Sequence, residues 1–62
     1  MPVSEQMQRE MDQAAEEAGE ELQQHFNEWS AQDLAGWWMK WYLKAGHKRL
    51  GRILVKIGKT HA

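Results

Sequence analysis

Apolar residues recur at spacings of three and four along most of this chain, a pattern typical of helices that bury one side. The first such stripe predicts a helix over about residues 4–27, with Ser4 as its N-cap. Its members are mostly methionine and alanine: Met7, Met11, Ala14, Ala15, Ala18, Leu22 and Phe26. Because a short helix gains most of its stability from packing, so thin a stripe needs a partner element to cover it.

A specific capping pattern separates this helix from the next one. Ser30 and Asp33 match the Ser-x-x-Asp capping box, and Trp29 and Leu34 stand at the two positions of a hydrophobic staple. The pattern predicts a turn over 28–30 and a second helix that starts directly after the capping serine.

The second apolar stripe predicts one long helix over about residues 31–57, followed by a frayed tail at 58–62. Gly46 lies in its interior and could end it early. The next three residues are His-Lys-Arg, which supply no N-cap and would place cations at the positive end of a new helix. We therefore expect one helix with a kink at Gly46. Two helices of similar length joined by a short turn favour an antiparallel hairpin.

A small core limits the stability of the isolated chain. Its 62 residues include no cysteine, so disulfides and thiolate metal sites cannot supplement that core. We predict an all-α fold, with one domain over 1–62 built as an antiparallel two-helix hairpin that self-associates into a helical bundle of two or more copies. No apolar stretch is long enough to cross a membrane and the N-terminus lacks a secretory signal, which favours a cytoplasmic protein.

Charge is strongly segregated along the sequence. Residues 1–33 hold all nine acidic residues and one basic residue, a formal charge of −8, whereas residues 34–62 hold seven basic residues and no acidic one. All four tryptophans lie from Trp29 onward. Such asymmetry indicates either two halves that pair with each other or a basic segment that binds an anionic partner.

The second predicted helix has two faces of interest. The face expected to pack on the first helix consists of Ala35, Met39, Leu43, Gly46, Leu50, Ile53, Leu54 and Ile57. The opposite face carries the predicted partner-binding residues Leu34, Trp37, Trp38, Trp41, Lys44, Lys48, Arg49, Arg52 and Lys56. Because a single partner helix cannot bury both faces, we expect another molecule to cover the tryptophans. They would form either the core of an oligomer or an exposed docking patch.

The cations on this face have two interpretations. Acidic residues of the first helix could neutralise them, within or between subunits, or they could orient an acidic partner and raise its association rate. We predict a small, non-enzymatic protein–protein interaction module, an adaptor, regulator or inhibitor, that binds itself and another protein. The alternative is a peripheral binder of anionic membrane surfaces through the same residues. Nucleic acid is disfavoured because the isoelectric point is about 6.3 and no known reader motif is present.

No catalytic residue, cofactor or small-molecule substrate is predicted. The chain lacks a glycine-rich phosphate loop and a nucleophile elbow, and Ser4 and Ser30 are better used as helix caps. Glu21, His25 and Glu28 share one side of the first helix at a spacing that could bind a divalent ion. We expect His25 at the edge of the core instead, and predict no metal site.

Overall fold

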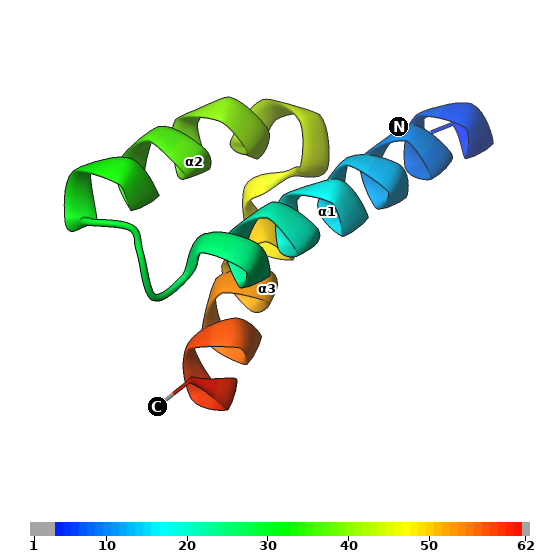
Figure 1. Cartoon of the computed structure of the whole chain (residues 1–62). Helices are drawn as coiled ribbons and strands as arrows, with labels where there is room; N and C mark the ends of the chain where they lie inside the picture. Colours follow the sequence, from blue (N-terminus) through cyan, green and yellow to red (C-terminus); the bar gives the residue numbers. More distant parts are fainter. Residues whose placement is uncertain (1–3, 62) are drawn as a thin grey trace.

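The computed structural model describes residues 4–61, and these form three α-helices without a strand among them. Helix α1 spans Glu5–His25, α2 spans Ala31–Ala45 and α3 spans His47–Thr60. In Figure 1, α2 lies above α1, and α3 passes below α1, on the side opposite to α2. The predicted all-α class is confirmed, whereas the predicted two-helix hairpin is wrong.

The contacts define the directions of the helices. Leu34, near the start of α2, shares a groove with Phe26, and Leu43, near its end, shares one with Met11, so α2 runs antiparallel to α1. Helix α3 runs back in the direction of α1, because Arg49 near its start pairs with Asp12 and His61 after its end stacks on Phe26. Both later helices therefore pack on α1.

Local hydrogen bonds start the first two helices as predicted. The hydroxyl of Ser4 accepts a hydrogen bond from the Met7 backbone N–H at 3.1 Å. The capping box at the start of α2 is complete: Asp33 N–H donates to Ser30 Oγ at 3.2 Å, and Ser30 N–H donates to Asp33 Oδ2 at 3.1 Å. Because every partner lies within three residues, these caps could be predicted from the sequence alone.

The long second helix predicted over 31–57 is divided at Gly46. Gly46 has φ of 87° and ψ of 139°, a conformation open to glycine and strongly disfavoured for other residues. Its N–H donates to the Tyr42 carbonyl at 2.9 Å, and its own carbonyl accepts from Leu50 N–H at 3.0 Å. One residue thus ends α2 and begins α3, which continues to Thr60 through residues expected to fray.

Burial explains why α3 starts without a side-chain cap and with cations in its first turn. Those two features cost about 0.3–1 kcal/mol for each unfavourable charge and about 1 kcal/mol for the missing cap. Dividing the chain at Gly46 lets α2 bury Trp37 and Trp41 while α3 buries Leu50 and Ile57, and full burial of a large apolar side chain is worth about 1.5–3 kcal/mol. The long-range gain exceeds the local cost.

The core combines small residues of α1 with large residues of α2 and α3. Its buried members are Ala14, Ala18, Leu22, Trp37, Trp41, Ala45, Leu50 and Ile57. Around them lie the partly buried Ala15, Phe26, Trp29, Leu34, Trp38, Ile53 and Leu54. The alanines of α1 leave room for the two indole rings, so the stripe that looked thin in the sequence complements the tryptophans.

The predicted core face of the second helix is correct for its second half and wrong for its first half. Leu50 and Ile57 are buried as expected, but Met39 and Leu43 are 71% and 80% exposed. The break at Gly46 removes the requirement that both halves present the same face to α1. Helix α2 therefore presents its tryptophan face, since each buried aromatic side chain removes about 150–250 Å² from water.

Candidate functional site

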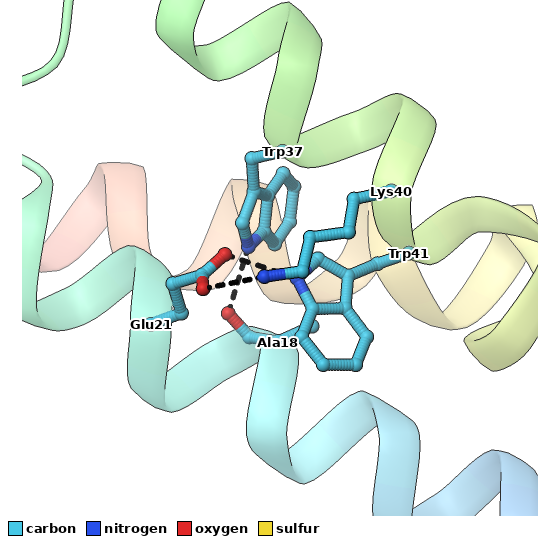
Figure 2. Close-up of polar contacts among 5 residues, drawn as sticks. All are labelled: Ala18, Glu21, Trp37, Lys40 and Trp41. Atoms are coloured by element: carbon cyan, nitrogen blue, oxygen red, sulfur yellow. Dashed lines mark hydrogen bonds and ion pairs between the residues drawn. The ribbon is translucent and has the colours of Figure 1, made fainter.

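The two buried tryptophans are held by polar contacts between α1 and α2 (Figure 2). Trp37 Nε1 donates to the Ala18 carbonyl at 2.9 Å, and Trp41 Nε1 donates to Glu21 Oε1 at 3.1 Å. Lys40 Nζ donates to the other oxygen of Glu21 at 2.9 Å. Both indole N–H groups therefore have acceptors, which removes the cost of burying them.

Glu21 is the acceptor that joins two side chains of α2. The indole N–H of Trp41 lowers the pKa of Glu21 below its usual value of 4.5, and Lys40 lowers it further, while partial burial acts in the opposite direction. Hydrogen bonds to a carboxylate favour its charged form. Glu21 is therefore ionised at neutral pH and fastens α2 to α1.

The tryptophans predicted to bind a partner are covered by the chain itself. Trp37 and Trp41 are only 2% and 8% exposed, and Leu34 and Trp38 are half-buried against the same core. The expectation that another molecule must cover them is wrong, because α1 and α3 together enclose this face. Neither an oligomer core nor a docking patch is needed to explain their presence.

Three of the seven basic side chains in residues 34–62 contact neighbours within the chain. Arg49 is paired with Asp12, and Lys40 is paired with Glu21. Lys44 places its ammonium 5.4 Å from the centre of the Trp41 ring, within the range of a cation–π interaction. Acidic residues of α1 therefore neutralise part of the basic half, as one of the two interpretations expected.

The remaining cations form one exposed face of α3. We define the cationic face of α3 as Lys48, Arg52, Lys56 and Lys59, with Val55 among them. None of these four cations is paired with an acidic residue in the stretch from 4 to 61 that the structure describes. Val55 is 56% exposed and, with Gly51, contributes to a shallow hollow that is also lined by three of the cations.

Lys59 was not among the predicted binding residues. Its sequence position is three residues after Lys56 and seven after Arg52, which places it on the same side of a helix. The sequence shows this spacing, but residues 58–62 were expected to fray. A helical spacing was therefore not applied to Lys59. Lys48, Arg52 and Lys56 are exposed on α3, whereas Arg49 turns toward α1.

A second exposed face lies on α2. We define the outer face of α2 as Gln32, Ala35, Gly36, Met39, Tyr42 and Leu43. All six residues are exposed, and five of them are apolar or aromatic. This surface was missed because Ala35, Met39 and Leu43 were assigned to the core.

The possible metal-binding triplet does not assemble. His25 Nδ1 lies 3.3 Å from Glu28 Oε2 and its ring stacks on Trp29, whereas Glu21 turns to Trp41. Within residues 4–61 no three histidine, aspartate or glutamate side chains gather in a way that could hold a metal ion. None of the three described helices is both long and apolar enough to cross a membrane.

Comparison with known proteins provides no functional assignment. No protein family model, curated protein or solved structure matches this chain. The two exposed faces and the charges around them are therefore the features from which a function can be inferred.

Proposed function

We propose that this chain is a small, non-catalytic protein–protein interaction module that self-associates and binds an acidic surface of another protein, as an adaptor, regulator or inhibitor. The cationic face of α3 is the binding surface. One observation carries this proposal: four exposed cations share one side of α3 with an exposed valine, and none has an acidic partner within residues 4–61.

The composition of this face favours a protein over a membrane or a nucleic acid. A helix that lies in a membrane surface inserts a broad apolar face, often with tryptophan. Helix α3 uses Leu50 and Ile57 in the core, and Trp37 and Trp41 are buried, so Val55 is the large apolar side chain left among the cations. Binding of single-stranded nucleic acid relies on accessible aromatic rings for stacking, which the buried indoles cannot supply.

Electrostatics determines how such a face would work. Exposed charges on one side of a small protein steer an oppositely charged partner and mainly raise the association rate. Screening lowers this contribution as the ionic strength rises, because the Debye length falls from about 10 Å at 0.1 M salt to about 3 Å at 1 M. Binding by this face should therefore be strong at low salt and weak at high salt.

The exposed surface of the chain supports self-association. The chain exposes 4967 Å², whereas a compact monomer of 7.3 kDa exposes about 4,200 Å². A chain this small has a limited core, and oligomerisation is one way in which such chains gain stability. Sedimentation equilibrium of the intact chain at micromolar concentrations should show a dimer or a larger species.

The cationic face can be tested with a defined acidic probe. We would titrate the intact, isotopically labelled chain with a glutamate-rich peptide and follow its backbone amide signals by NMR. Signals of α3 should shift at low salt, and the double substitution Arg52→Gln and Lys56→Gln should weaken binding several-fold. The matched control, Gln8→Glu with Gln13→Glu, lowers the net charge by the same two units at exposed positions of α1 and should retain most of the affinity.

Several outcomes of this experiment would contradict the proposal. One is the absence of α3 shifts at low salt, and another is an equal loss of affinity in the control variant. The same measurements with vesicles containing phosphatidylserine and with a single-stranded oligonucleotide complete the test. Tighter binding of either than of the peptide would replace the protein partner with a membrane or a nucleic acid.

A further inference from the structure

We infer that two copies of this chain pack their α2 helices antiparallel, outer face against outer face, with Met39 at the two-fold axis. The inference rests on the proposed self-association and names the surface that mediates it. That surface is separate from the cationic face of α3, so the dimer would leave both cationic faces available.

Exposed apolar side chains are the first argument. Met39 and Leu43 are 71% and 80% exposed, and Tyr42 beside them is also exposed. Leu43 additionally lines a groove with Met7 and Met11 of α1. Contiguous apolar side chains of this size on a monomer mark a contact surface, because water gains freedom when they are covered.

Gly36 is the second argument. It lies inside α2, where glycine weakens a helix relative to alanine. Its backbone has no positive φ, which among the described residues occurs only at Gly46, and a Cβ atom placed there would meet nothing within 4 Å. Nothing within the described chain therefore requires glycine at this position, whereas close approach of a second helix would.

The distribution of large and small residues along α2 is the third argument. The small residues Ala35 and Gly36 precede Met39, and the large residues Tyr42 and Leu43 follow it at matching distances. Antiparallel packing about Met39 therefore places large residues on small ones in both halves. Leu43 of one copy would enter the space bounded by Gln32, Ala35, Gly36 and Met39 of the other, as a knob enters a hole.

The order of residues along the outer face favours a second copy over an unrelated partner. The small residues Ala35 and Gly36 and the large residues Tyr42 and Leu43 stand at equal distances on either side of Met39, so this face is complementary to itself. A two-fold axis perpendicular to the helices relates two such faces and makes each contact twice.

Sedimentation equilibrium of the intact chain and of three single variants tests the interface. Leu43→Glu places a charge in the predicted hole, and Gly36→Leu fills the hole from a position where a Cβ atom meets nothing within 4 Å. Each should raise the dimer dissociation constant by about tenfold or more. The matched control Val55→Glu changes an exposed apolar residue on α3 and should alter this constant by less than about twofold. Circular dichroism should show unchanged helix content in all three variants.

The outcomes distinguish this interface from self-association itself. A wild-type chain that remains monomeric at the highest concentration overturns both self-association and the α2 interface. A wild-type dimer that neither Leu43→Glu nor Gly36→Leu weakens leaves self-association standing and overturns the α2 interface. A dimer that Val55→Glu weakens as strongly as Leu43→Glu overturns it too, because the contact would then include α3.

Discussion

Replacing Gly46 by alanine distinguishes the three-helix fold from a continuous second helix, because the two predict opposite changes in the free energy of unfolding. In a continuous helix over 31–57, Gly46→Ala would stabilise the chain by about 0.5–1 kcal/mol, because alanine is the better helix former. In the observed fold Gly46 has φ of 87°, and a residue with a side chain is strained there by about 1–3 kcal/mol. We therefore expect destabilisation of about 1–3 kcal/mol.

Crowding around residue 46 adds to the destabilisation expected of Gly46→Ala. A Cβ atom there would lie 2.9 Å from Met11 Cε, which is the end of a flexible side chain and can move. Substituting Met11 by alanine in the Gly46→Ala background should therefore remove the crowding and leave the backbone strain. The loss of unfolding free energy that remains, measured relative to Met11→Ala alone, is the cost of the backbone strain at residue 46.

Urea denaturation followed by circular dichroism measures this effect. A chain of 62 residues has a free energy of unfolding of roughly 3–9 kcal/mol, so a loss of about 1–3 kcal/mol shifts the midpoint clearly. Gly58→Ala is the matched control, because Gly58 lies inside α3 with nothing within 4 Å of a Cβ atom and should gain slightly in stability. Equal stabilisation by both substitutions would refute the break at Gly46.

Two further predictions concern the contacts between α1 and α2. Trp37→Phe removes the indole N–H that donates to the Ala18 carbonyl at 2.9 Å, and should lower the free energy of unfolding by about 1–2 kcal/mol in the same denaturation assay. The pKa of Glu21 is lowered by its hydrogen bond from Trp41, so its contribution to stability is complete above pH 4.5, the usual pKa, and is lost as the pH falls through the lower folded-state value. Glu21→Gln should therefore reduce the loss of stability between neutral and acidic pH, and an unchanged pH dependence would contradict this assignment.

The features of the fold that could be predicted are those whose causes lie close together in the sequence. The capping box joins Ser30 to Asp33, and the N-cap of α1 joins Ser4 to Met7, so both follow from residues three apart. The helical class follows from apolar spacing alone. These interactions form wherever the segments are placed, which is why they needed no knowledge of tertiary structure.

The features that could not be predicted depend on contacts between distant segments. Gly46 was judged by the poor helix-start signal that follows it, but the break lets Trp37 and Trp41 of α2 pack in the core together with Leu50 and Ile57 of α3. The orientation of Trp37 depends on small residues of α1 nineteen positions earlier, where the Ala18 carbonyl accepts its N–H. Local sequence patterns do not report burial between distant segments. They could therefore not show that such burial outweighs the missing cap of α3.

The break at Gly46 also determines both candidate surfaces. A continuous helix would have carried Met39 and Leu43 inward together with Leu50, because all three lie on one side of an unbroken helix. Once the helix divides, α2 buries its tryptophan face and exposes Met39 and Leu43, while α3 buries Leu50 and exposes its cations. The proposed self-association through α2 and the proposed acidic recognition through α3 would therefore both depend on the same glycine, and a variant that strains it should weaken both together.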